Sequence, residues 1–133
     1  MKARVSWHEG MRFVGVGDSG HAVLMDTAPE VGGEDSGPRP AELLLFALGG
    51  CTAMDVLSTL KKMRTLPTHL EVEIEAERAP EHPKFIRRAH LTYRASGVPE
   101  ENLRRAAQLS QERYCMVAHS LSGELSFSVE VVD

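Results

Sequence analysis

The sequence has few cysteines, few aromatic residues and little excess charge of either sign, and these shortages exclude several classes of protein. Only two cysteines occur among 133 residues, Cys51 and Cys115. Because neither lies in a C-x-x-C pair, a disulfide framework and a zinc ribbon are excluded. The formal net charge is −4 with no basic block, so we expect no binding to nucleic acid or to an acidic membrane surface.

Long apolar runs are also scarce. The longest, Leu43 to Gly50, is too short for the ~20 residues that span a bilayer, and the N-terminal residues lack the apolar segment of a signal peptide. We therefore expect a cytoplasmic protein that does not enter membranes. Apolar residues make up 42% of the chain and charged residues 26%, a balance typical of a globular protein. The length predicts a single domain over residues 1–133.

The pattern of apolar and turn residues predicts an α+β fold, with strands grouped around two helices rather than alternating with them. The first three strands should form an antiparallel meander, followed by a Gly- and Pro-rich loop over residues 28–40. A long helix is expected over residues 40–64, and a second helix opens at residues 99–101. The expected strands cover residues 3–7, 11–16, 21–25, 70–77, 85–95 and 125–131.

The long helix is apolar nearly all round. Between Leu43 and Leu57 its only polar side chains are Thr52 and Asp55, so the helix should be buried on most sides. Two consecutive glycines precede Cys51, and each costs about 1 kcal/mol relative to alanine inside a helix. Close packing against another backbone and access for a ligand are both open explanations.

The charged residues of the second half lie at strand spacing. Glutamate alternates with apolar residues over 70–77, and the strand at 85–95 carries Arg88 and Arg94 on one side. An antiparallel pair would place arginine opposite glutamate. These charges therefore predict a solvated sheet face rather than a binding stripe.

The two thiols are either inert core residues or a redox pair. Cys51 lies mid-helix, where a buried small side chain is the ordinary interpretation. Cys115 follows the expected end of the second helix, where a turn could expose it and Arg113 could favour its thiolate, so it looks the more reactive. His119 follows Cys115 by four residues, but two thiols and one histidine without flanking ligands predict no metal site.

Two stretches resemble the OsmC/Ohr superfamily, the osmotically inducible and organic hydroperoxide resistance proteins. They are residues 38–56, which contain Gly-Gly-Cys-Thr-Ala-Met-Asp, and residues 113–117, Arg-Tyr-Cys-Met-Val. The resemblance implies an OsmC-like fold, with antiparallel sheets around a long buried helix. It also implies an intertwined homodimer whose active sites combine both subunits, and no bound cofactor.

The resemblance further implies a thiol-dependent peroxidase. Cys51 would attack an organic hydroperoxide and become a sulfenic acid, Cys115 would resolve it as a disulfide, and an external thiol, for example of the lipoyl type, would restore both. Glu42 matches the acidic position of the OsmC-like branch, and Arg12 lies close to the family arginine, with which it aligns after a shift of about one residue. Glu42 is equally explained as a first-turn charge, and Arg12 as a solvated strand residue.

Asp55 should then be paired with a cation or turned away, because an uncompensated carboxylate raises the pKa of a neighbouring thiol. A function of another class stays open beside the peroxidase. The same apolar cleft could serve a non-catalytic small-molecule binding protein, with the cysteines as lining.

Overall fold

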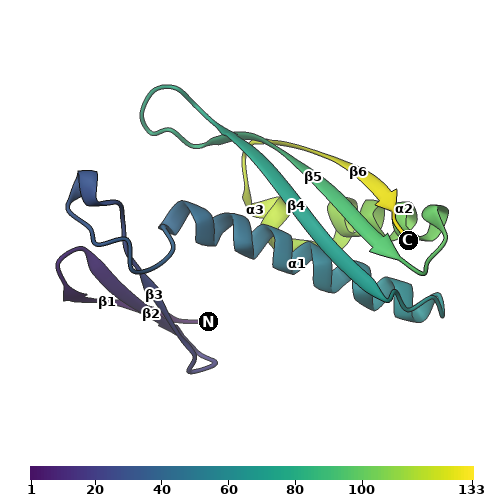
Figure 1. Ribbon diagram of the computed structural model, residues 1–133, viewed down its shortest axis with the longest axis horizontal. Helices are drawn as coiled ribbons and strands as arrows, with labels where there is room; N and C mark the ends of the chain where they lie inside the picture. The colour runs from purple at the N-terminus through teal and green to yellow at the C-terminus, as the bar shows by residue number, and fades with distance from the viewer. The chain divides into compact units, whose positions relative to one another are not determined.

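The computed structural model describes residues 1–133, which divide into two compact units, Met1–Leu45 and Phe46–Asp133. Each unit has its own three-stranded sheet (Figure 1). The predicted α+β class is confirmed, because the strands are grouped around the helices. The long helix α1 (Pro40–Lys62) begins in the N-terminal unit and continues through the C-terminal unit.

The N-terminal unit is an antiparallel meander, as predicted. Its sheet contains β1 (Ala3–Glu9), β2 (Arg12–Gly17) and β3 (Ala22–Met25), in that order. A 3-10 turn, Pro29–Val31, lies in the loop that follows. Loop residues are held by one buried carboxylate, that of Asp26.

Asp26 is the only buried residue of the N-terminal unit. Its carboxylate accepts hydrogen bonds from the Ser36 hydroxyl at 2.6 Å and from the backbone N–H groups of Thr27, Glu34 and Ser36. The Ser36 hydroxyl is the main reason why the pKa of Asp26 lies far below its usual value. The ionised carboxylate thus ties both ends of the loop together.

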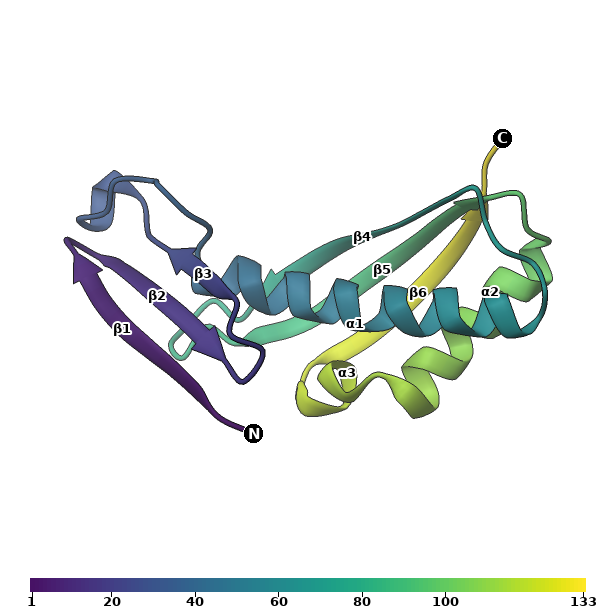
Figure 2. The ribbon, with the colours of Figure 1, turned by 90° about the horizontal axis from the view of Figure 1, so that it is seen from below.

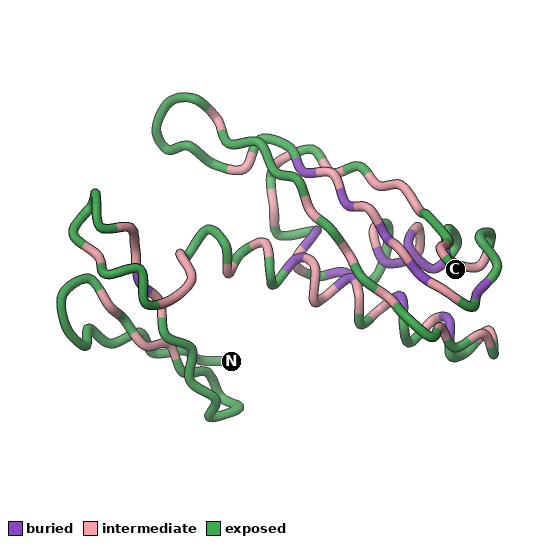
Figure 3. The backbone as a smooth tube through the Cα atoms, viewed as in Figure 1, coloured by how far each residue is buried: buried purple, intermediate pink, exposed green.

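One face of this sheet is apolar and has no cover within the unit. Val5, Trp7 and Phe13 all point to that face, because Trp7 pairs directly with Phe13 and Val5 lies two residues before Trp7. Trp7 is 68% exposed. Figure 3 shows the strands of this unit as exposed or intermediate.

The C-terminal unit packs helices against one face of its sheet (Figures 1 and 2). β4 pairs antiparallel with β5, and β5 pairs parallel with β6. The sheet strands and the helices that follow α1 are β4 (His69–Arg78), β5 (Ile86–Ser96), α2 (Glu100–Leu109), α3 (Met116–Ser120) and β6 (Glu124–Val131). A π-helical segment, Ser110–Tyr114, lies between α2 and α3.

The core forms where α1, β5 and α2 meet. α1 buries a stripe of residues spaced four apart, β5 buries every second residue, and α2 buries one side. These spacings are the helical and strand periods. The buried apolar residues of the three elements are Leu48, Val56, Leu60, Ala89, Leu91, Tyr93, Ala95, Leu103, Ala106 and Ala107.

The outer face of the sheet carries the predicted pairs of opposite charge. The Arg94 guanidinium donates to Glu73 at 2.8 Å and to Glu130 at 3.0 Å, and Arg88 lies 3.4 Å from Glu77. All these groups are solvent-accessible, so each pair contributes little to stability.

Three features differ from the sequence expectation. The second helix is α-helical only to Leu109. The last strand, β6, is parallel to its neighbour β5. Parallel pairing needs a long connection, which the helical segment between β5 and β6 supplies. By length and composition α1 could also span a bilayer, although its apolar segment had looked too short. A core helix has the same properties, and α1 contributes Leu48, Val56 and Leu60 to the core.

The start of β6 depends on a glycine. A Cβ on Gly123 would lie 2.3 Å from the Ile86 carbonyl oxygen and 2.8 Å from that of Arg87. Because both obstacles are backbone atoms, we expect Gly123→Ala to lower the free energy of unfolding by about 1–3 kcal/mol, measured by urea denaturation. Gly17→Ala is the control, since its Cβ would meet nothing closer than 3.9 Å. Equal stability of the two variants would contradict the prediction.

Candidate active site

The two cysteines meet in the C-terminal unit, together with one carboxylate. The sulfur atoms of Cys51 and Cys115 and a carboxylate oxygen of Asp55 all lie within 4.8 Å of one another. Both thiols are free. A disulfide has an S–S length of about 2.05 Å, so the sulfurs need to close by less than about 3 Å. We call these three residues the thiol cluster.

Local structure explains how distant residues reach one place. Cys51 and Asp55 lie one turn apart on α1, on the same side. Cys115 ends the π-helical segment and is the N-cap of α3, where its sulfur accepts the Ala118 N–H at 3.4 Å. Five-residue π turns are rare and re-aim the side chains that follow them.

The two thiols differ in exposure, in the opposite sense to the sequence expectation. Cys115 is fully buried, whereas Cys51 is partly exposed. The pKa of the Cys115 thiol is raised to about 11, chiefly by burial; the Ala118 N–H acts in the opposite direction, and Cys51 and Asp55 add to the increase. The prediction that a turn exposes Cys115 and that Arg113 favours its thiolate is therefore wrong. Arg113 instead stacks over the Tyr114 ring.

A buried chain of hydroxyl groups ends at the thiol cluster. The Gln111 amide donates to Tyr93 Oη at 2.8 Å, and Tyr93 Oη lies 2.6 Å from Thr52 Oγ1. Thr52 Oγ1 lies 2.7 Å from Ser110 Oγ, which donates to Asp55 Oδ2 at 2.9 Å. We call Tyr93, Thr52 and Ser110 the hydroxyl chain.

Sequence reasoning missed the hydroxyl chain, although one signal for it was present. Thr52 and Asp55 are the two polar residues in the apolar stretch of α1, and both belong to this network. Tyr93 and Ser110 gave no comparable signal, because each fits an ordinary apolar position of its strand or helix. Burial raises the pKa of Tyr93, so its phenol stays protonated.

We had expected Asp55 to be paired with a cation or turned away from the thiols, and it is neither. No lysine, arginine or histidine forms an ion pair with it, and its carboxylate is not turned away from the thiols. Its hydrogen-bond donor is the Ser110 hydroxyl. Within the chain, the carboxyl group is therefore supported by a neutral hydroxyl alone.

The thiol cluster contains the residues that could hold a metal ion, since zinc accepts thiolate and carboxylate ligands. His119, considered from its spacing, is not among them. Its Nε2 instead contacts the Gln111 carbonyl oxygen at 3.1 Å.

Arg12 and Glu42 lie in the N-terminal unit. The Arg12 guanidinium forms ion pairs with Glu9 at 3.2 Å and Glu34 at 3.1 Å, and its Nε–H is buried without a partner. Glu42 Oε1 accepts the Arg39 N–H at 2.9 Å. This contact is the reciprocal half of a helix capping box, so Glu42 stabilises the start of α1.

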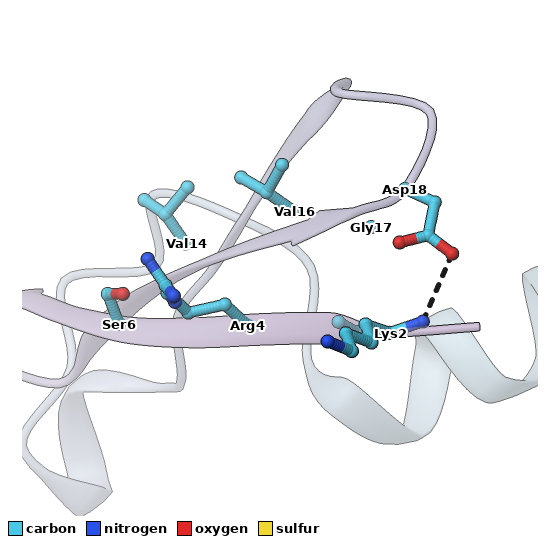
Figure 4. Close-up of a pocket in the computed structure, with 8 residues that line it drawn as sticks. Lys2, Arg4, Ser6, Val14, Val16, Gly17 and Asp18 are labelled. Atoms are coloured by element: carbon cyan, nitrogen blue, oxygen red, sulfur yellow. Dashed lines mark hydrogen bonds between the residues drawn. The ribbon is translucent and has the colours of Figure 1, made fainter.

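Two open pockets lie in the N-terminal unit and contain no thiol. One, on the opposite face of the sheet from Trp7, is lined by Lys2, by Arg4 and Ser6 of β1, by Val14 and Val16 of β2, and by Asp18, whose carboxylate accepts the Lys2 backbone N–H (Figure 4). The other, of about 400 Å³, lies on the apolar face and is lined mainly by Val5, Phe13, Met25 and Val31. Neither contains a cluster of groups suited to catalysis.

The family model described as OsmC-like protein matches residues 33–130, which include both cysteines and the whole of α1. The chain belongs to this family. The resemblance seen in the sequence is thereby confirmed, and with it the OsmC-like fold. Protein YhfA of Escherichia coli K12 is 39% identical to this OsmC-like protein over 136 residues, covering 99% of this chain and 98% of YhfA.

Solved structures agree on the fold. A hypothetical protein from Aquifex aeolicus VF5 is 27% identical with a TM-score of 0.80, covering 99% of this chain and 97% of that one. An organic hydroperoxide resistance protein from Legionella pneumophila, described as a predicted redox protein, is 14% identical with a TM-score of 0.71, covering 99% and 96%. The OsmC-like protein thus has the fold of a family that includes proteins described as redox proteins.

Proposed function

We propose that this OsmC-like protein is a thiol-dependent peroxidase that reduces organic hydroperoxides to alcohols. The observation that carries the proposal is the meeting of two free cysteines, 64 positions apart in sequence, within 4.8 Å of each other's sulfur. Two thiols at that separation can exchange two electrons with a substrate and store the oxidation as a disulfide. Such a protein would protect against oxidative stress.

The reaction balances with the residues present and one external reductant. The Cys51 thiolate attacks the distal peroxide oxygen, the O–O bond breaks, and the alkoxide leaves as an alcohol after taking a proton. Cys51 is then a sulfenic acid, two electrons more oxidised. Cys115 displaces its oxygen as water and forms the disulfide, which an external dithiol reduces.

Exposure supports this division of roles. Cys51 is partly exposed and can meet a substrate, while Cys115 is buried and can meet only Cys51. The buried thiol, protonated at neutral pH, is itself protected from direct oxidation because the thiolate is the reactive form.

Arg12 and Glu42 enter the proposal as a thiolate stabiliser and a group that orients the site. The buried Nε–H of Arg12 has no acceptor within the chain. Buried donors of this kind are rarely left unpaired, which supports a further partner for this side chain.

We propose further that the protein is a homodimer. Each unit leaves an apolar surface without cover: the sheet face with Val5 and Trp7, and the α1 face with Phe46 and Met54. Gly50 lies on that same helix face, and a Cβ there would meet nothing within 4 Å. A second copy could therefore approach the helix closely at the glycine.

A thiol titration tests the peroxidase function. The reduced protein should lose both free thiols after one equivalent of cumene hydroperoxide and regain them with a dithiol reductant. Trapping with a sulfenic acid reagent at early times should label Cys51. Unchanged thiols after prolonged exposure would reject the peroxidase.

The apolar pocket of the N-terminal unit favours a second candidate, a small-molecule binding protein. Its volume of about 400 Å³ suits a small apolar ligand. Trp7 lies on the same sheet face as the lining residue Phe13, so binding should change the fluorescence of this single tryptophan. Inert thiols together with saturable quenching of Trp7 would favour the binding protein.

The peroxidase should prefer organic hydroperoxides to hydrogen peroxide. Phe46 and Met54 expose apolar surface on the helix that carries Cys51. Burying a tail of three or four carbons contributes about 0.8 kcal/mol per CH₂, which predicts a kcat/KM roughly 50- to 200-fold higher for tert-butyl hydroperoxide than for hydrogen peroxide. Equal values of kcat/KM would contradict this.

A further inference from the structure

The hydrogen-bond chain that leads to Asp55 has a fixed direction. An ionised carboxylate can only accept, so Ser110 must donate to Asp55 and must accept from Thr52. Thr52 in turn accepts from Tyr93, whose oxygen is left to accept from the Gln111 amide. The direction runs from Gln111 to Asp55 without a break.

The last hydrogen bond of this chain holds the Asp55 carboxylate in place. Each hydroxyl that accepts one hydrogen bond donates the next more strongly, so the dipoles of the chain add up toward the carboxylate. The three hydroxyl-bearing residues are fully buried, where water competes little. The chain therefore supplies a neutral hydrogen-bond donor to a carboxyl group that has no cation partner.

The position of this anion does not suit activation of a thiolate by charge. A neighbouring carboxylate disfavours the ionisation of a thiol, and Asp55 is one of the groups that raise the pKa of Cys115. A buried thiol that must act as a nucleophile needs somewhere to send its proton. The Asp55 carboxylate, with an oxygen within 4.8 Å of that sulfur, is close enough to take the proton directly or through one water.

We propose that Asp55 is the proton acceptor for Cys115 in the step that closes the disulfide, and that Ser110 positions it. The inference rests on the proposed thiol peroxidase and adds a catalytic residue to it. The Cys115 sulfur forms the S–S bond with Cys51 while the Cys51 S–O bond breaks. The thiol proton passes to Asp55 and from there to the departing hydroxide, which leaves as water.

Asp55→Asn separates this role from a purely electrostatic one. The amide keeps the shape of the side chain and an oxygen for Ser110, but it cannot accept the proton. After one equivalent of hydroperoxide, we expect sulfenic acid formation at Cys51 to be no slower than in wild type. Disulfide closure at pH 7 should be slower by at least about tenfold, in line with the range for general base catalysis.

The dependence on pH supplies a readout that altered packing would not change. Without the base, closure must use the small thiolate fraction of Cys115, which rises tenfold per pH unit below the thiol pKa. The Asp55→Asn rate should therefore climb steeply from pH 7 to 10, while the wild-type rate stays nearly flat. If Asp55 acts only by repelling the thiolate, its removal should instead speed closure at pH 7, and that result overturns the proposal.

A second assay works even if hydroperoxides do not react. A chromogenic aromatic disulfide should first modify the accessible Cys51 and release one coloured thiol, and attack by Cys115 then releases a second one. We expect Asp55→Asn to slow only the second release. Failure of the wild-type protein to form a sulfenic acid would reject the peroxidase, whereas an unchanged second release would reject the role of Asp55.

Two variants and one treatment complete the design. Ser110→Ala keeps the carboxylate but removes its donor and should slow closure less than Asp55→Asn. Asp18→Asn is the matched control, because Asp18 is an exposed carboxylate of the N-terminal unit that accepts a single N–H; it should behave as wild type. All rates are measured with a chelator present, so that no bound metal contributes, and equal closure rates of wild type and Asp55→Asn under that condition would reject the role of Asp55.

Discussion

Cys51→Ser should abolish consumption of organic hydroperoxide. A serine hydroxyl is close to the thiol in size but is neither ionised at neutral pH nor oxidised by a peroxide, so the first chemical step has no nucleophile. Because Cys51 is partly exposed at mid-helix, the fold should tolerate the change, which circular dichroism can check. We expect peroxide loss at the rate of buffer alone.

Cys115→Ser should give a different defect. The hydroxyl can still cap α3 by accepting the Ala118 N–H, but it cannot close a disulfide. The variant should consume one equivalent of hydroperoxide, stop, and hold a sulfenic acid on Cys51 that is open to over-oxidation. Full turnover by Cys51→Ser, or repeated turnover by Cys115→Ser without another thiol taking its place, would show that this pair does not carry the chemistry.

The sequence predicted the elements that depend on periodicity. The strict alternation over residues 70–77 and the apolar helix from Pro40 became β4 and α1, with ends within a few residues. Each pattern reports which side of an element is buried, and the core lies on those sides. The arginine and glutamate pairing across β4 and β5 followed from the same register.

The environment of Cys115 could not be predicted because it depends on a local break in periodicity. A helical pattern continued through Ser110 and Tyr114 places the following residue on a turn beside Arg113. The π-helical segment instead directs Cys115 into the core and Ser110 toward Thr52 and Asp55. An inserted residue in a helix leaves almost no trace in a single sequence.

The parallel pairing of β6 did have a signal that was not used. Residues 97–123 between β5 and β6 are long enough for a helical crossover and contain α2, the usual requirement for adjacent parallel strands. The grouping of strands favoured an α+β fold, and the family resemblance implied antiparallel sheets. The crossover matters for the site, since it carries Ser110, Gln111 and Cys115 to the face of α1.

Met54→Asp should convert the proposed dimer into monomers. Met54 is 73% exposed in the single chain and shares the uncovered helix face with Phe46 and Leu57, which are 59% and 38% exposed. In a symmetric dimer the change occurs in both copies. Each copy then loses about 1.5–3 kcal/mol of binding free energy from the burial of its Met54 side chain. For the two copies together this predicts a dissociation constant weaker by roughly 10²- to 10⁴-fold, before any cost of burying the carboxylate.

Sedimentation velocity over nanomolar to micromolar concentrations measures this directly. Leu66→Asp is the control, since Leu66 is a similarly exposed apolar residue in the segment after α1 and outside the helix face; it should remain dimeric. If the Met54→Asp chain unfolds when it dissociates, the wild-type Tm should rise with protein concentration, because the dimer then stabilises the fold by mass action. A wild-type protein that sediments as a folded monomer at micromolar concentration would contradict the dimer, and the apolar face of α1 would then need another cover.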